Sequence, residues 1–184
     1  MSNTEIEDVD GIAIVGMAGR FPRARNIDEF WRNLRNGVEA ISFFTEEELR
    51  SAGVDSALLS DPSYVRANAT LEDTELFDAS FFGINHREAE SMDPQQRIFL
   101  ECAWEALENA GYSADSYQGR IGVYAGHGLT SYLLSNLYSN RQSLWALSGS
   151  QTFFGNDKDH LSTRVSYKPN LHGPSLSVQT ACST

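Results

Sequence analysis

The sequence predicts an α/β fold in which helices flank a largely buried sheet. Short apolar runs bounded by glycine or proline occur at residues 11–16, 120–126 and 174–181, and such runs are typical of strands covered on both faces. Segments with helical periodicity lie between these runs. The chain has 184 residues, which is enough for one domain with a hydrophobic core. Strands that alternate with helices indicate α/β architecture.

Capping patterns predict the first two helices. In residues 26–37, Asn26 is the expected N-cap, Glu29 stands at N3 as in a capping box, and Gly37 ends the helix. Residues 45–53 repeat this pattern and predict a second helix. The first helix also carries one apolar stripe, formed by Ile27, Phe30, Trp31 and Leu34.

The strongest helical pattern covers residues 93–111. Asp93 is the expected N-cap, and Pro94 occupies N1, where its missing N–H costs nothing. Gln96 stands at N3. We interpret Asp93, Gln95 and Gln96 as capping residues and none of them as catalytic. The expected buried stripe consists of Phe99, Cys102, Ala103, Ala106, Leu107 and Ala110.

The remaining segments divide into a helix, an irregular region and a lead-in. Residues 156–167 predict a helix capped by Asn156 or Asp157. The region at about 43–85 holds short β-like pieces among polar turns, and we expect it to be an insertion across the sheet edge. Residues 1–10 are acidic and polar, and we interpret them as a flexible lead-in.

Charge and composition exclude several classes of protein. The net charge is -11 and the pI is about 4.7, so we expect no nucleic-acid partner and no binding to anionic membranes. No apolar run reaches the ~18 residues that a membrane-spanning helix needs. The first residues do not resemble a signal peptide, and two cysteines make no disulfide framework. We therefore expect a cytoplasmic protein in a reducing environment.

Cys182 has the surroundings of a nucleophile. It follows the third apolar run directly, at the point where a helix is expected to begin, and free N–H groups and the helix dipole favour a thiolate there. The N–H of Cys182 would also face a developing oxyanion. The alternative is a small buried hydrophobe, which is the role we assign to Cys102 on its helical stripe. Spacing alone leaves both interpretations of Cys182 open.

Four long segments, in order, resemble one family. Residues 12–41, 76–112, 155–167 and 173–184 are similar to the opening half of a β-ketoacyl synthase, and most similar to the ketosynthase domains of modular type I polyketide synthases. This resemblance implies a thiolase-like fold, in which two related halves form layers in the order α-β-α-β-α.

The resemblance also implies a reaction. Cys182 in "TACS" matches the nucleophile that takes an acyl chain from a phosphopantetheine thioester. A malonyl-type unit on an acyl carrier protein then loses CO₂, and its carbanion attacks the acyl-cysteine in a Claisen condensation. The phosphopantetheine is presented by the carrier protein, so the resemblance implies no directly bound cofactor and no metal. Residues 175–180 match the strand that pairs across the two-fold axis of a homodimer.

Several residues depart from the family pattern. The two catalytic histidines and the lysine of the family belong to the second half, and His86, His127, His160 and His172 match none of them. His86 stands where proline is common. His127, at a glycine-flanked strand end, either lines a pocket or is a satisfied loop histidine, and we expect His160 and His172 to be solvated. Pro169 replaces the usual leucine and prevents a helix from continuing there.

The chain stops two residues beyond Cys182, so we expect residues 11–184 to be the N-terminal portion of a ketosynthase domain. We expect this portion alone to be inactive, because covalent catalysis needs an activator beside the nucleophile. One alternative is a non-catalytic docking or dimerisation module that keeps the ketosynthase surface. Another is a dinucleotide-binding domain, but Gly11, Gly16 and Gly19 do not fit the G-x-G-x-x-G spacing.

Overall fold

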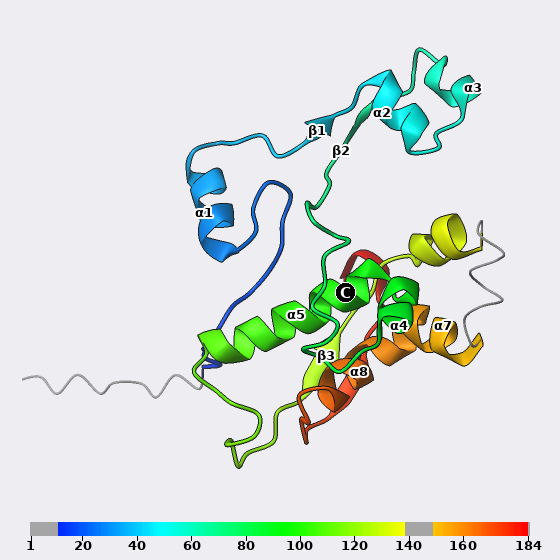
Figure 1. The fold of residues 1–184 in the computed structure, drawn as a ribbon. Coiled ribbons are helices and arrows are strands. Elements are labelled where there is room, and N and C mark those ends of the chain that lie inside the picture. Colours follow the sequence, from blue (N-terminus) through cyan, green and yellow to red (C-terminus); the bar gives the residue numbers. More distant parts are fainter. Residues whose placement is uncertain (1–10, 139–148, 184) are drawn as a thin grey trace, which may run out of the picture.

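The computed structural model describes residues 11–138 and 149–183 (Figure 1). The expected lead-in at residues 1–10 lies outside this part. The helices are α1 Ile27–Arg35, α2 Glu46–Ser51, α3 Ser56–Leu59, α4 His86–Ser91, α5 Pro94–Asn109, α7 Gly149–Asn156 and α8 Leu161–Tyr167. The strands are β1 Ser42–Phe43, β2 Ala67–Asn68, β3 Val123–Ala125 and β4 Ser175–Ser177. A π-helical turn covers Leu133–Leu137, and 3₁₀ turns cover Lys158–His160 and Ala181–Ser183.

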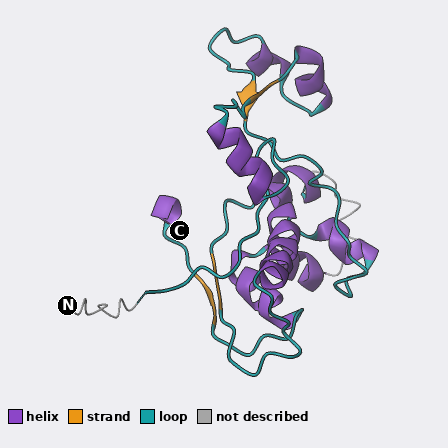
Figure 2. Ribbon diagram, turned by 90° about the vertical axis from the view of Figure 1, so that its left-hand side faces the viewer, coloured by secondary structure: helices purple, strands orange, loops and turns teal. Residues whose placement is uncertain are grey.

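The sheet that carries the candidate site is a parallel pair, β3 and β4. Val123 pairs with Ser175 and Ala125 with Ser177. Figure 2 shows the helices of this part of the molecule on one side of the pair, where α8 packs against both strands and α5 packs against α8. Tyr124 on the other face is 64% exposed. The predicted α/β class is therefore confirmed, but the expectation of a sheet buried on both faces is wrong for this pair.

The core lies between α4, α5, α8 and β3. Met92, Leu100 and Val165 are fully buried in it. The helix α5 begins and ends where its caps predict. The residues that it buries most fully are Leu100, Gln96 and Arg97, and none of these belongs to the predicted stripe. Burial of each large core side chain contributes about 1.5–3 kcal/mol, so this cluster dominates the stability of the molecule.

Arg164, whose side chain is mostly buried, joins the helices α8, α4 and α5 beside this core. Arg164 of α8 donates from Nη1 to Glu88 of α4 at 3.0 Å and from Nε to Oε1 of Gln96 at 3.1 Å. The amide nitrogen of Gln96 donates to the carbonyl of Asp157 at 3.1 Å. The prediction that Gln96 caps α5 is therefore wrong, since its side chain points into the helix packing. The interpretation of Asp93 as the N-cap is confirmed, because its carboxylate accepts from the N–H of Gln95.

The capped helices near the N-terminus form as predicted. Asn26 accepts from the N–H of Glu29, and Gly37 at φ +62° follows the C-cap of α1. The carboxylate of Glu29 accepts from the N–H of Arg25 instead of that of Asn26, so the box is shifted by one residue. In α2 the complete capping box is present. These ends need only local hydrogen bonds, which explains why the sequence predicts them well.

The strand predicted at residues 11–16 is not formed. The segment is extended, Ile12 and Ile14 are exposed, and within residues 11–138 and 149–183 no strand pairs with it. It runs instead over the C-terminal turns of α5. There the N–H of Met17 donates to Asn109, and a Cβ on Gly16 would lie 2.5 Å from the carbonyl of Ala106. An apolar run predicts burial, but a strand also needs a neighbour whose backbone is free to pair.

The region expected to be an insertion divides into two parts. Residues 42–68 form an arm that holds the antiparallel pair β1–β2 with α2 and α3, and it projects away from β3 and β4 (Figures 1 and 2). Its strands form a separate sheet and do not lie across the edge of the β3–β4 pair. Ile84 belongs to the core cluster, and Phe77 and Phe82 pack against it. The expected boundary at residue 85 was therefore placed too late, because these three side chains already pack with the body.

Candidate active site

Cys182 lies at the edge where both strands of the parallel pair end. The strands β3 and β4 run in the same direction, so the residues that follow them meet at one edge of the sheet. Cys182 sits in the 3₁₀ turn Ala181–Ser183, which follows β4 closely and stands out from the body in Figure 2. The residue is exposed. The interpretation of Cys182 as a small buried hydrophobe is therefore wrong.

The turn before Cys182 has an uncommon backbone conformation. Ala181 has a φ of +55°, in the left-handed region that residues with a Cβ rarely adopt. Such a conformation costs about 1–3 kcal/mol and persists only where the surrounding structure holds it. A strand, a strained turn and then a nucleophile is the arrangement that presents a reactive side chain above a sheet edge.

The part of the chain that the structure describes brings no activating group to the thiol. Within residues 11–138 and 149–183, no hydrogen bond or ion pair joins the side chain of Cys182 to another residue. The turn that contains it is a single 3₁₀ turn, so its N–H groups belong to an element too short for a substantial helix dipole. The described residues thus expose the thiol of Cys182 without a hydrogen-bonding or charged partner beside it.

Gln179 joins the two strand ends. With its amide oriented to satisfy both groups, the nitrogen donates to the carbonyl of His127 at 3.0 Å and the oxygen accepts from the N–H of His127 at 3.1 Å. The strand ladder leads to this point, because the N–H of Val178 donates to the carbonyl of Ala125 at 2.8 Å. One side chain therefore continues the pairing of β4 with β3 for a further step toward Cys182.

A second glutamine holds the same loop from the side of α5. The oxygen of Gln95 accepts from the N–H of Gly128 at 2.9 Å, and its nitrogen donates to the carbonyl of Leu129 at 3.4 Å. A Cβ on Gly128 would lie 2.8 Å from this oxygen, so a larger residue there would have to displace the side chain of Gln95. The interpretation of Gln95 as a capping residue is therefore wrong, since its side chain fixes the loop after β3.

The side chain of His127 is buried beneath this loop. Its Nδ1 lies 2.6 Å from the carbonyl of Gly128, and because a carbonyl only accepts, Nδ1 carries the proton. Its Nε2 lies 4.0 Å from Oδ2 of Asp93, and both atoms are buried without a hydrogen-bond partner. His127 is thus a loop histidine. Its partners place it under the strand ends and away from a substrate-facing surface.

The other three histidines lie elsewhere. The side chain of His86 is 88% exposed, at the start of α4, with Nε2 3.6 Å from Glu90. His172 is exposed, as predicted. His160 is half-buried against the rings of Phe153 and Phe154, so the expectation that it is solvated is wrong. No hydrogen bond or ion pair in the described part of the chain connects a histidine with Cys182.

The second cysteine is structural, as predicted. Cys102 is half-buried on α5, and burial raises the pKa of its thiol. The neighbouring Glu105 accepts two hydrogen bonds from Arg20, which lower the pKa of its carboxyl and raise the pKa of the guanidinium. A thiol with a raised pKa is mostly protonated near neutral pH and is a poor nucleophile.

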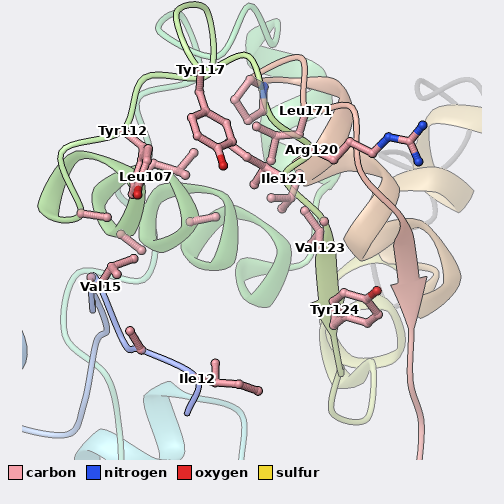
Figure 3. A pocket seen from close by; sticks show the side chains of 18 residues that line it. Ile12, Val15, Leu107, Tyr112, Tyr117, Arg120, Ile121, Val123, Tyr124 and Leu171 are labelled. Carbon is pink, nitrogen blue, oxygen red and sulfur yellow. The ribbon is translucent and has the colours of Figure 1, made fainter. Parts of the chain in front are cut away.

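A large cavity lies away from Cys182. It is an open pocket with a volume of about 900 Å³, lined by residues of α5, β3, the loop before β3 and the segment 12–16. Figure 3 shows Ile12 and Val15 on one side of it, and Val123 and Tyr124 on another. Pro169 also lines it, just beyond the end of α8, where the helix stops as predicted. Neither Cys182 nor His127 lines this cavity.

Metal ligands and membrane-spanning helices are both missing from the residues that the structure describes. Among these residues, no group of three or more histidine, cysteine, aspartate or glutamate side chains could hold a metal ion. In the same residues, no helix has both the length and the hydropathy needed to cross a bilayer.

Comparison with known proteins decides the family. Residues 10–184 match the family described as beta-ketoacyl synthase, N-terminal domain. The chain belongs to this family. One of the subunits of the phenolphthiocerol/phthiocerol polyketide synthase of Mycobacterium tuberculosis is 48% identical over 181 residues, which are 95% of this chain and 12% of that protein. Polyketide synthase PksL of Bacillus subtilis is 39% identical over 191 residues, covering 97% of this chain and 4% of that protein.

Solved ketosynthases share the fold. Ketosynthase twelve of the bacillaene polyketide synthase from Bacillus amyloliquefaciens superposes with a TM-score of 0.78 at 39% identity, covering 93% of this chain and 29% of that one. An oxazolomycin ketosynthase domain from Streptomyces albus gives a TM-score of 0.75 at 33% identity, with 92% and 29% covered. This chain is therefore part of a thiolase-like ketosynthase domain of the modular polyketide synthase type. It spans less than a third of these solved ketosynthases and a small part of the curated relatives.

Sequence reasoning named Cys182 as the candidate nucleophile, which stays a prediction, and missed the residues that hold the strand before it. Gln179 and Gln95 are polar residues beside an apolar strand and a helix cap, and each position has an ordinary interpretation as a solvent-facing or capping side chain. The signal that could have found Gln179 is its place at the end of an apolar run, three residues before the nucleophile.

Proposed function

We propose that this chain is the nucleophile-bearing part of a ketosynthase that condenses an acyl chain with a malonyl-type unit. The observation that carries the proposal is the exposed thiol of Cys182 on a strained turn, at the shared carboxyl edge of β3 and β4. The names of the relatives support the class of reaction, since those compared are polyketide synthases or their ketosynthases.

The proposed reaction has two stages. The thiolate of Cys182 attacks the carbonyl carbon of an acyl-phosphopantetheine thioester, with the N–H of Cys182 as one oxyanion donor, and the carrier's thiolate leaves and takes a proton. A malonyl-type thioester on acyl carrier protein then loses CO₂ and forms a carbanion. This carbanion attacks the acyl group, a C–C bond forms, and the sulfur of Cys182 leaves as the thiolate. The partners are thus acyl carrier protein and its two thioesters.

We also propose that residues 1–184 alone do not condense. The described residues bring no base, lysine or histidine to the thiol, and covalent catalysis by a cysteine needs such an activating group beside it. Both cysteines are free, which fits the reducing cytoplasm that we propose as its location.

A homodimer formed along β4 completes the proposal. In the described residues β4 pairs on one edge only, with β3, which leaves its other edge for a second copy. Leu176 and Val178 are 52% and 44% exposed beside that edge, and an unpaired apolar edge is a ready site for strand pairing.

The test is acylation of a named thiol. The full-length polypeptide that carries these residues and, in parallel, residues 1–184 alone are incubated with an acyl-pantetheine thioester, and the peptides are analysed by mass spectrometry. We expect the acyl adduct on Cys182 and none on Cys102. Addition of malonyl carrier protein to the full-length polypeptide should release a β-ketoacyl product, whereas residues 1–184 alone should release none.

Two variants make the result specific. Cys182→Ala should abolish the adduct, and Cys102→Ala, the matched control, should retain it. An adduct that persists in Cys182→Ala would falsify the assignment. Absence of an adduct from the unmodified full-length polypeptide would instead favour a docking or dimerisation module.

A further inference from the structure

We propose that Gln179 is a positioning residue for Cys182. Its side-chain amide fastens the end of β4 to the main chain of the loop after β3, so that the turn carrying the thiol starts from a fixed point. This role rests on the proposed function, since it concerns the rate at which Cys182 is acylated.

The geometry of the contact supports this role. The amide of Gln179 makes two hydrogen bonds to the same residue, 3.0 Å to the carbonyl and 3.1 Å to the N–H of His127. Two bonds from one planar group fix orientation as well as distance, as a single bond does not. They extend the β3–β4 ladder beyond the bond from Val178 to Ala125, which is the last backbone pair before the turn.

The strain in the turn makes an anchor necessary. Ala181, two residues after Gln179, has a φ of +55°. A residue with a Cβ stays in this region only where its flanks are held. Without an anchor at Gln179, the turn could relax and carry Cys182 away from the strand edge.

The loop to which Gln179 bonds is itself held firmly. Gln95 bonds to the main chain at Gly128 and Leu129 from the side of α5. The side chain of His127 is buried and bonded to the carbonyl of Gly128. Gln179 therefore fastens the turn to a loop that is held from two further sides. Through this loop the turn is connected to α5 and the core.

Because Gln179 is exposed, a positioning role can be distinguished from a structural role by measuring stability and acylation rate separately. Gln179 is exposed, so its replacement removes little packing. We expect Gln179→Met to shift the midpoint of thermal unfolding by less than about 3 °C, as for other surface substitutions. The rate of acylation should nevertheless fall, because a displacement of the nucleophile by ~1 Å is enough to slow a reaction roughly a hundredfold.

The experiment measures acyl transfer from an acyl-pantetheine thioester to Cys182 in the full-length polypeptide. For Gln179→Met we expect the maximal rate to fall roughly ten- to a hundredfold, with less than about a twofold change in the half-saturating thioester concentration. Gln179→Glu keeps the acceptor for the N–H of His127 but turns a carboxylate oxygen toward its carbonyl, so its rate should fall at least as far as that of Gln179→Met. Gln118→Met, in an exposed loop, is the matched control and should react like the unmodified protein.

Hydrogen exchange tests the clamp directly. The N–H of His127 should exchange at least about tenfold faster in Gln179→Met, because its acceptor is lost. Equal exchange and equal acylation in Gln179→Met and Gln118→Met would overturn the inference while the proposed function stood. A raised half-saturating concentration with an unchanged maximal rate would also overturn it, since that result means binding and not positioning. Failure of the unmodified protein to acylate Cys182 would overturn both proposals.

Discussion

The arm at residues 42–68 and the body around α5 are built in different ways. In the arm, each helix is closed by its own cap, and large apolar side chains such as Phe43 and Val65 are 78% and 74% exposed. In the body, Met92, Leu100 and Val165 come from three separate segments and exclude water completely. The ends of the helices in the arm therefore depend on contacts between neighbours in sequence, and the β1–β2 pair and the Arg66–Glu46 ion pair add longer-range contacts there. The body is held by a core drawn from separate segments.

This difference explains where sequence reasoning works. A capping box lies within four residues and can be recognised in a short stretch of sequence. A core contact such as that between Leu100 and Val165 depends on how α5 and α8 cross, which no local pattern records. Matched substitutions in the arm and the body test this distinction. A pH titration of the ion pair between the segment before α1 and α5 tests it further.

The first test substitutes one leucine from each region. Leu100→Ala should lower the free energy of unfolding by about 2–5 kcal/mol, because it leaves a cavity in a core that cannot close around it. Leu58→Ala in α3, where the side chain is 46% exposed, should lower it by less than about 1 kcal/mol. Urea unfolding followed by circular dichroism measures both. Equal losses would contradict the division into two kinds of region.

The second test substitutes one arginine from each region. Arg164→Met removes the charge that pairs with Glu88, whose side chain is 23% exposed against 11% for Arg164, and we expect a loss of about 1.5–3 kcal/mol. Arg50→Met breaks the pair with Glu46 in the arm, where both partners are largely in water, and should cause no measurable loss. The same unfolding assay distinguishes them. A loss for Arg50→Met as large as that for Arg164→Met would show that the arm is held by its charges.

The third test uses pH to probe the pair between Arg20 and Glu105, which ties the segment before α1 to α5. Hydrogen bonds from Arg20 lower the pKa of Glu105, so its stabilising contribution is present above the ordinary glutamate pKa and is lost as pH falls through the native value. Glu105→Gln should cost no more than about 1 kcal/mol near neutral pH, since solvent screens the pair, and nothing in strong acid. Urea unfolding at a series of pH values measures this course.

Glu101 on the same helix is the matched control for this pH dependence. Burial raises the pKa of its carboxyl, so the stability it contributes is present at low pH and is lost as pH rises. Glu101→Gln should therefore change the free energy of unfolding with pH in the opposite direction to Glu105→Gln. If the two variants followed the same pH course, the pairing of Arg20 with Glu105 would not be the cause.

The fold was predictable as far as local signals reach. The caps of α1, α2 and α5 and the strands β3 and β4 follow from turn chemistry and apolar runs. The strand expected at residues 11–16 failed because pairing needs a partner, and the sequence does not show which backbone edge is available. The roles of Gln95 and Gln96 were missed for a related reason, since a polar residue at a helix start predicts a cap unless the neighbouring elements are known.

Sequence reasoning pointed to Cys182 as the candidate site residue but not to the side chains that hold the loop and the strand end beside it. Cys182 follows from an apolar run and from the resemblance of "TACS" to a nucleophile motif. The buried position of His127 depends on the loop after β3 folding under the end of β4, and the two segments are far apart in sequence. Local patterns could therefore only leave its role open.

The parallel pairing of β3 with β4 has a consequence for the order of folding. About fifty residues separate the two strands, and closing so long a loop costs entropy before the pairing returns any stability. The capped helix α5 needs no such closure, so we expect it to form early and β4 to dock late. In that order Cys182 would reach the sheet edge only after the rest of the body is assembled, and a chain caught short of that step would hold its thiol away from the edge.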